Sequence, residues 1–600
     1  MSAQKYSVNQ QLVETLLSFV KSGDISIPEI QRPFVWKNAK VRDLLDSLYQ
    51  GYPVGYLITW QNPDVKLKQD GAYSTGNKVL IDGQQRITAL KAAILGDEVI
   101  SSDYKKIKIK IAFNPMEEKF EVSNPAIEKD KTWIPNIATL LSEDMISILS
   151  IVREYCSVNE DVNEVQVEQA ISRLLNIKKM QIGMIELAHD LDIETVSEIF
   201  IRINSQGVVL SQADFVMSKI ASNEIYDGSM LRKAVDYFCH TAIQPAFYEQ
   251  IKNNDEEFVK SIYYPRMKWL KDDNDDLFDP EYTDMLRVAF TYKFGRGKLS
   301  DLVNLLSGRN FETRTYEEEI AEASFNTLKD GVMDFMKQTN FERFVMIIKS
   351  SGFIIPSMIR SKNALNFAYI VYLKLVEMGI DSNLLSSYVS RWFVLSILTG
   401  RYSGSPESRF DFDIKQIAKT DFSELLTKTE NGELSDAFWD VVLPQKFDSS
   451  VASSPYFNVF IAAQNKMKNR GFLSKDITVY DMVSHRGDIH HIFPRDYLKK
   501  NGFARGKYNQ IANYVYTESP INIKIGNKAP EIYFSHLQEQ CETGNLHYGA
   551  IKDMQDLKDN LSENAIPLEI FDMKLDDYDT FLTERRKLMS QKIKSYYENL

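Results

Sequence analysis

The sequence has few cysteines and no long apolar runs. Its 600 residues contain three cysteines, and no two of them form a C-x-x-C pair. A disulfide framework and a cysteine zinc site are therefore excluded, and a reducing, cytoplasmic location is expected. The apolar stretch 365–376 is interrupted by Lys374 well short of a membrane span. We expect no membrane partner.

An overall positive charge, which blanket binding of nucleic acid requires, is also absent. The formal net charge is −12, whereas affinity for DNA comes chiefly from neutralised phosphates. The charge is uneven, however, because eight basic side chains accompany only three acidic ones between residues 485 and 530. This basic island comprises Arg486, Arg495, Lys499, Lys500, Arg505, Lys507, Lys524 and Lys528. It predicts a local nucleic-acid contact, with an ordinary solvated surface as the alternative.

The composition and the hydrophobic pattern indicate a multidomain α+β protein. Apolar residues make up 44% of the chain and aromatic residues 12%, enough to fill several cores. Helical and strand patterns alternate in residues 1–221, and residues 222–445 are almost wholly helical. A polar linker then introduces a third domain, 446–600, which ends in a charged amphipathic helix. In the first domain the spacing predicts a helix over 8–21 and an alternating strand over 106–113.

A strand-like run ends abruptly in the motif DGQQR, residues 82–86, and turns at once into a helical pattern. Such a corner, with Gly83 in the tight turn, aims backbone N–H groups and the positive end of a helix at one point. That point suits an anion, because Arg86 can form a bidentate fork to a phosphate while Gln84 and Gln85 add neutral donors. Asp82 can hold a ribose hydroxyl, a metal or a water. The alternative is a structural corner with Asp82 as the helix N-cap.

Two further polar clusters lie in the first domain. Gln31 and Arg32 occur in the extended segment IPEIQRPFVW, and Arg202 and Asn204 precede a glycine turn in FIRINSQG. Together with the DGQQR corner they make three arginine-bearing clusters in one mixed domain. We expect them to converge on one binding site.

These motifs resemble a known family. IPEIQRPFVW, YPVGYLITW, LIDGQQRITAL and FIRINSQGVVLSQADF occur in this order within residues 8–220. They are similar to the amino-terminal domain of the GmrSD-like modification-dependent (type IV) restriction enzymes, a relative of the ParB/sulfiredoxin-type nucleotide-binding folds. The resemblance implies an α/β domain that binds and hydrolyses a nucleoside triphosphate, with residues 82–86 at the phosphates.

The segment DIHHIFP, residues 488–494, contains residue types suited to phosphodiester hydrolysis. The reaction needs an activated water and a cation at the phosphate oxygens. His491 can be the base. A Mg²⁺-like ion would take His490, Asn522 and Asp488, with water and phosphate completing the octahedron. Neighbours in a strand point to opposite faces, so both histidines reach one site only where the strand twists or ends. The alternative is an ordinary pair of surface histidines.

The order DIHHIFP, IAN and PINIKIGNKAP resembles the HNH (ββα-metal) nuclease domain at the carboxyl end of the same restriction enzymes. The resemblance implies that His491 is the general base, that His490 and Asn522 are metal ligands, and that Asn513 fixes the geometry of the loop and the base. Many HNH nucleases have an acidic residue in place of His490 and a glycine in place of Ala512. Mg²⁺ or Mn²⁺ is expected, and the histidine at position 490 favours Mn²⁺, Ni²⁺ or Zn²⁺ more than an aspartate would, so the identity of the metal stays open.

The sequence thus predicts a nucleotide-regulated, metal-dependent endonuclease that restricts modified phage DNA. Two alternatives stay open: a nucleotide-dependent nucleic-acid-binding switch with a degenerate HNH site, and an HNH nickase or RNase of a toxin-like system. A homodimer is expected for double-strand cutting, because one HNH site cuts one strand. The modification that is read, the sign of the nucleotide effect and the role of the helical domain do not follow from the sequence.

Overall fold

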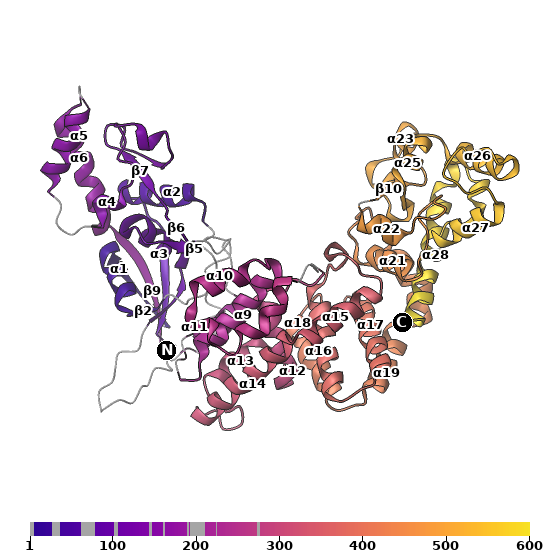
Figure 1. The fold of residues 1–600 in the computed structure, drawn as a ribbon, viewed down its shortest axis with the longest axis horizontal. Helices are drawn as coiled ribbons and strands as arrows, with labels where there is room; N and C mark the ends of the chain where they lie inside the picture. The colour runs from indigo at the N-terminus through magenta and orange to yellow at the C-terminus, as the bar shows by residue number, and fades with distance from the viewer. Residues whose placement is uncertain are drawn as a thin grey trace. The chain divides into compact units, whose positions relative to one another are not determined.

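The chain forms two compact units, which Figure 1 shows as a ribbon. The computed structural model describes residues 5–26, 36–61, 78–100, 106–142, 147–159, 162–188, 191, 211–221, 223, 225–272, 277–485 and 487–600. The first unit comprises Met1–Ser229 with Phe311–Tyr316, and the second comprises Met230–Asn310 with Glu317–Leu600. The protein is therefore multidomain and mixes α and β structure, while the three predicted domain boundaries stay a prediction. Within the described ranges, no helix combines the length and apolar character needed to cross a membrane.

The first unit is built on a five-stranded sheet with the order β1-β9-β3-β4-β2. Its strands are β1 (Tyr6–Leu12), β2 (Ile25–Ser26), β3 (Tyr56–Gln61), β4 (Lys78–Asp82) and β9 (Gln181–Leu187). The β1–β9 and β3–β4 pairs are antiparallel, whereas the β3–β9 and β2–β4 pairs are parallel. The helices whose apolar sides join the sheet in one core are α1 (Val13–Ser22), α2 (Asn38–Tyr49) and α3 (Gln84–Leu90). This sheet positions the DGQQR corner, because β4 ends at its first residue.

The predicted helix over 8–21 is wrong in its first part. Residues 6–12 form strand β1, in which Val8 pairs with Ile185 of β9, and the helix begins only at Val13. Val8 is 55% exposed, so the apolar stripe that suggested a longer helix is not a buried face at this point. Pairing with the distant strand β9 therefore outweighs the helical spacing of the apolar residues in this segment. The helix ends as predicted, at Gly23 with a φ of 84°.

Other predicted elements of the first unit are found with modest changes. The strand predicted over 106–113 is divided into β6 (Lys106–Ile107) and β7 (Ile111–Asn114). The helical pattern predicted directly after DGQQR is found as α3, which continues into the π-helical turn η1 (Lys91–Leu95).

The second unit is dominated by helices, as predicted for its middle part. The long helices of this part are α12 (Tyr282–Phe294), α14 (Glu318–Met336), α15 (Gln338–Ser350), α16 (Lys362–Glu377) and α17 (Ser382–Thr399). Helix α16 is buried on almost every side, which explains why its apolar run is nearly continuous.

The last part of the second unit places a short hairpin among helices. Its elements are α21 (Pro455–Lys466), β10 (Asp488–His491), β11 (Tyr514–Thr517), α25 (Ser519–Ile525) and α28 (Tyr578–Glu598). Strands β10 and β11 are antiparallel, with His490 opposite Val515. Helix α28 confirms the predicted amphipathic helix, and its apolar residues such as Phe581 and Ile593 are buried.

Arg585 connects α28 to the backbone around β11. Its side chain is fully buried, and its Nη1 donates to the carbonyl oxygen of Ala512 at 2.7 Å. Its Nη2 donates to the carbonyl oxygens of Tyr514, at 2.8 Å, and Asn564, at 3.2 Å. Burial lowers the pKa of Arg585 to about 9, which still leaves the guanidinium protonated at neutral pH. The charge is held by backbone oxygens on both sides of Asn513.

We predict that Arg585→Met lowers the free energy of unfolding by about 3 kcal/mol or more, because three buried carbonyl oxygens lose a charged donor. The neighbouring Arg586→Met is the matched control. Arg586 donates to Gln510 and to a largely exposed Asp448, so its loss should cost about 1 kcal/mol or less. Urea denaturation of the full chain followed by circular dichroism measures both values, and equal losses would contradict the structural role of Arg585.

Candidate functional site

His490 and Asn522 form a close, buried pair in the second unit. The Nδ1 atom of His490, in β10, lies 2.7 Å from Oδ1 of Asn522, in α25. The His490 side chain is 4% exposed and stacks against Phe472 with 6.1 Å between ring centroids. Its Nε2 atom is buried and has no hydrogen-bond partner within the described part of the chain. Burial lowers the pKa of His490 to about 4, so the imidazole is neutral at pH 7 and carries a nitrogen lone pair.

His491 has different partners, as strand alternation requires. Its Nε2 atom lies 3.1 Å from Oδ1 of Asn509, and its ring meets Tyr514 edge-on at 4.9 Å. An amide oxygen only accepts hydrogen bonds, so Asn509 selects the tautomer with the proton on Nε2 and the lone pair on Nδ1. Burial lowers the pKa of His491, which keeps the ring neutral near pH 7. The pair of ordinary surface histidines considered above is not what the structure contains.

Asn513 is fully buried and connects its own segment, just before β11, to the turn that follows the two histidines of β10. Its Oδ1 accepts from the backbone N–H of Phe493 at 2.8 Å, and its Nδ2 donates to the carbonyl oxygen of the same residue at 2.9 Å. Its own carbonyl oxygen accepts from the N–H of Ile492. These three bonds fix the turn that directly follows His491. Such contacts are what a residue that sets loop geometry requires.

The donors of His490 and Asn522 suit a divalent cation. In this structure Asn522 Oδ1 accepts from Nδ1 of His490 at 2.7 Å, and the two atoms could face one cation once the ring proton is on Nε2 instead. A neutral imidazole and an amide oxygen are both able to ligate Mg²⁺ or Mn²⁺. Asp488 belongs to β10, but its side chain lies outside what the structure describes. Among the described residues, no group of three or more His, Cys, Asp and Glu side chains could hold an ion. An ion here would take its other ligands from water and phosphate.

The DGQQR corner of the first unit places Arg86 against the backbone of β3. Its Nη1 donates to the carbonyl oxygen of Tyr56 at 2.9 Å. Gly55 lies so close that a Cβ there would be 2.9 Å from Nη2 of Arg86. Gly83 has a φ of 95°, and a Cβ on it would be 2.3 Å from Leu57 Cδ2. Both positions therefore need glycine for the guanidinium to lie where it does.

The other residues of this corner surround the start of α3. Gly83 is the N-cap of the helix, so the alternative with Asp82 as N-cap is wrong. Asp82 is the last residue of β4, and its charge opposes the burial that lowers the pKa of Arg86. Gln84 donates through Nε2 to the carbonyl oxygen of Leu80 at 3.3 Å, and Gln85 follows it in the first turn.

Four predicted binding residues, Gln31, Arg32, Arg202 and Asn204, lie outside the described residues. Their convergence on the DGQQR corner stays a prediction.

Two residues of the histidine site were missed at the level of sequence. Asn509 orients His491, and Arg585 holds the backbone beside Asn513. Asn509 lies in the basic island only four residues before Asn513, which was a usable signal. Arg585 belongs to a charged amphipathic helix, where an arginine is expected on the exposed face. Nothing in the sequence therefore indicated that it is buried beside Asn513.

Comparison with known proteins agrees with the motifs of the first unit. The family model described as the GmrSD restriction endonuclease, N-terminal domain, matches residues 13–221. This match supports a GmrSD-like type IV restriction enzyme. The chain is also similar to the uncharacterized protein MJ0686 of Methanocaldococcus jannaschii, with 22% identity over 642 aligned residues. That alignment covers 97% of this chain and 98% of the archaeal protein, so the likeness extends through both units.

We predict that Asn509→Asp raises the pKa of His491 by about one unit or more, because a carboxylate stabilises the protonated ring. Asn509→Leu should lower it, because the accepting oxygen is lost. The measurement is a titration of ¹³C-labelled histidine signals by NMR in the presence of a chelator. Asn501→Asp is the control, since the exposed side chain of Asn501 donates to the carbonyl oxygen of Tyr497 and not to His491. A His491 signal that ignores both Asn509 substitutions would rule out this contact.

Proposed function

We propose that the protein is a metal-dependent DNA endonuclease, regulated by a nucleoside triphosphate, that restricts phage DNA carrying modified bases or a modified backbone. The observation that carries the proposal is the match of residues 13–221 to a restriction endonuclease domain. We assign the cleavage to the second unit. Its elements β10, β11 and α25 follow the order of a ββα-metal nuclease, and they carry the histidine pair and Asn522.

The residues around β10 have distinct parts in the proposed reaction. His491 takes a proton through Nδ1 from the water that attacks phosphorus, while Asn509 holds its Nε2–H. As the new bond forms, the phosphorus–oxygen bond to one sugar breaks, and the departing sugar oxygen takes a proton from solvent. His490 and Asn522, with Asp488 as the third predicted ligand, would hold a divalent cation, which when bound would stabilise negative charge on the phosphate oxygens. Asn513 keeps the turn after His491 in place and so sets the direction of the base. Because burial lowers the pKa of His491, cleavage should stay active below pH 6.5 and be lost as the pH falls further.

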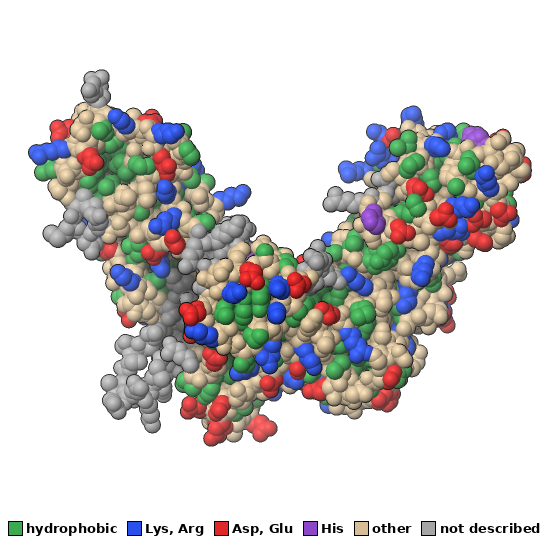
Figure 2. All heavy atoms as spheres, viewed as in Figure 1, with side chains coloured by type: hydrophobic (Ala, Val, Ile, Leu, Met, Phe, Trp, Pro, Cys, Tyr) green, Lys and Arg blue, Asp and Glu red, His purple; other side chains and the backbone are tan. Residues whose placement is uncertain are grey.

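The basic island supplies the surface for DNA. Helices α23 (Arg495–Lys500) and α24 (Arg505–Tyr508) carry exposed basic side chains and lie in sequence between His491 and Asn509. Figure 2 shows Lys and Arg side chains gathered near α23. These charges can neutralise phosphates beside the scissile bond. A homodimer would provide the second site for a double-strand cut.

The first unit is proposed as the regulatory part. The DGQQR corner would hold the nucleotide phosphates, with Arg86 as the cationic donor and with Gln31, Arg32, Arg202 and Asn204 completing the site. Its glycines support this role, because Gly55 and Gly83 let the guanidinium of Arg86 lie close to the backbone where β3 begins and β4 ends, which a Cβ would prevent.

We predict that His491→Ala reduces cleavage by about 100-fold or more, because the attacking water loses its base. The assay uses modified phage DNA and the same DNA unmodified, with Mg²⁺ or Mn²⁺, and with or without a mixture of nucleoside triphosphates. His485→Ala is the matched control, since His485 is exposed and bonds to the carbonyl oxygen of Asp481.

The assay also separates the alternatives. Full activity of His491→Ala would refute the assignment of the base. Nucleotide hydrolysis without cutting of either DNA would favour the nucleic-acid-binding switch, and cutting of RNA or of one strand only would favour the toxin-like enzyme.

We predict that Arg86→Ala weakens nucleotide binding by roughly 2–3 kcal/mol, the range for a charge-assisted hydrogen bond to phosphate. Isothermal titration calorimetry measures the affinity, and the melting temperature shows whether the first unit is intact. Arg173→Ala is the control, because Arg173 is an exposed residue of the same unit paired with Glu118. Unchanged affinity in Arg86→Ala would make DGQQR a structural corner only.

A further inference from the structure

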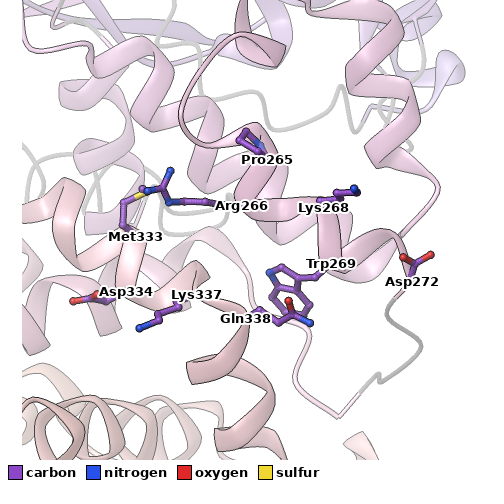
Figure 3. A pocket seen from close by; sticks show the side chains of 9 residues that line it. All are labelled: Pro265, Arg266, Lys268, Trp269, Asp272, Met333, Asp334, Lys337 and Gln338. Atoms are coloured by element: carbon purple, nitrogen blue, oxygen red, sulfur yellow. The ribbon is translucent and has the colours of Figure 1, made fainter.

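A second site lies on the helical part of the second unit and shares no residue with the histidine site. It is a pocket of about 680 Å³ between the 3-10 helix η4 (Tyr264–Asp272), the end of α14 and the start of α15. Figure 3 shows the side chains that line it. Volumes of about 300–1,000 Å³ are typical of sites for small ligands or for one unit of a polymer.

The aromatic wall of the pocket is held rigidly. Trp269 is half-buried, and its Nε1 donates to the carbonyl oxygen of Met336 at 3.3 Å. Its ring contacts Phe341 at 5.5 Å and Phe238 at 6.1 Å between centroids. The indole is thus fixed by the core on one side while it lines the pocket on the other. A flat ligand can stack there without an entropic cost for ordering the ring.

The rim of the pocket is rich in positive charge. Arg266, Lys268 and Lys337 line it with exposed side chains. Lys337 is both the C-cap of α14 and the N-cap of α15, so the opposite ends of two helix dipoles offset each other there, and the positive charge comes from the side chains themselves. The carboxylate of Asp334 is neutralised by Lys293 at 2.7 Å. The rim therefore favours an anion.

We infer that this pocket binds one unstacked nucleotide of the DNA strand, with the base on Trp269 and the neighbouring phosphates on Arg266, Lys268 and Lys337. An aromatic platform beside a cationic groove is the usual way to bind single-stranded nucleic acid. A simple inorganic anion has no flat surface to stack on the indole, and an apolar ligand gains nothing from the charged rim. Gln338 and Asp272 also line the pocket and offer acceptors for the amino groups of a base.

The inference rests on the proposed function, because it takes DNA as the ligand. Under this inference, the helical part of the second unit recognises a nucleotide that has left the base stack. Extrusion costs least for a base that is already poorly paired or unpaired, and a pocket of this size can accommodate a base with an added group. A free nucleotide has the same chemistry, so the experiment must distinguish the two sources.

The test is fluorescence anisotropy of a labelled single-stranded DNA oligonucleotide with the full chain, in the presence of a chelator so that cleavage plays no part. The double substitution Arg266→Glu/Lys337→Glu should lower the affinity about tenfold or more and flatten its salt dependence. Lys419→Glu/Lys428→Glu, an equal change of charge at exposed positions of the same unit, should lower it by no more than about twofold.

Trp269 is tested by two substitutions with different stacking ability. Trp269→Ala should lower the affinity about tenfold, whereas Trp269→Phe should restore most of it, because phenylalanine keeps a ring for the base. The melting temperature of each variant is measured beside the affinity. A charge-reversed variant that binds the oligonucleotide as tightly as the original chain would overturn the inference.

ATP binding by the same variants, measured in parallel, distinguishes a nucleotide within DNA from a free nucleotide as the ligand of the pocket. If the pocket variants lose ATP binding and keep oligonucleotide binding, the assignment to DNA is overturned. If they lose the oligonucleotide and keep ATP, it is supported. These binding measurements need neither a metal ion nor His491. They therefore test the pocket even if the proposed cleavage is not observed.

Discussion

The histidine site depends on the pleat of one short strand. Neighbouring side chains of β10 point to opposite faces, so His490 and His491 have different partners within the protein. Each histidine meets its own asparagine, Asn522 for one and Asn509 for the other. The strand ends at His491, and the turn that follows is fixed by the amide of Asn513. Two identical side chains thereby acquire separate environments within one hairpin.

These environments are stabilised by contacts from distant parts of the chain. The backbone that carries Asn513 accepts hydrogen bonds from Arg585, and the carbonyl oxygen of Ile492 accepts one from the hydroxyl of Tyr533. Burying a neutral imidazole and a charged guanidinium costs free energy, which the packed helices around the hairpin must offset. The last helix therefore contributes to the site although it holds none of the proposed catalytic groups.

Local patterns predicted much of this molecule, because many of its elements depend on neighbours in sequence. Helix α3 after DGQQR and the last helix, α28, were found where the pattern placed them, and α16 and α17 lie in the part expected to be almost wholly helical. The start of the chain was not, because β1 pairs with β9, whose residues lie far away in sequence. Of the histidine site, the sequence indicated the residue types and their order. It offered only the nearness of Asn509 to Asn513 as a signal for one partner and none for Arg585, because the fold alone brings that residue to the hairpin. Trp269 belongs to no motif, and only a described cavity draws attention to it.

The order of strands in the first unit has a consequence for synthesis. Strand β9 lies between β1 and β3, so neither of these early strands has its full set of backbone partners until residues 181–187 are available. At about 5–20 residues per second, a ribosome needs on the order of 10–30 s to proceed from β1 to β9. During that interval β1 is an unpaired strand edge. The nascent chain therefore carries a strand that is open to premature pairing until β9 emerges and joins β1 to β3.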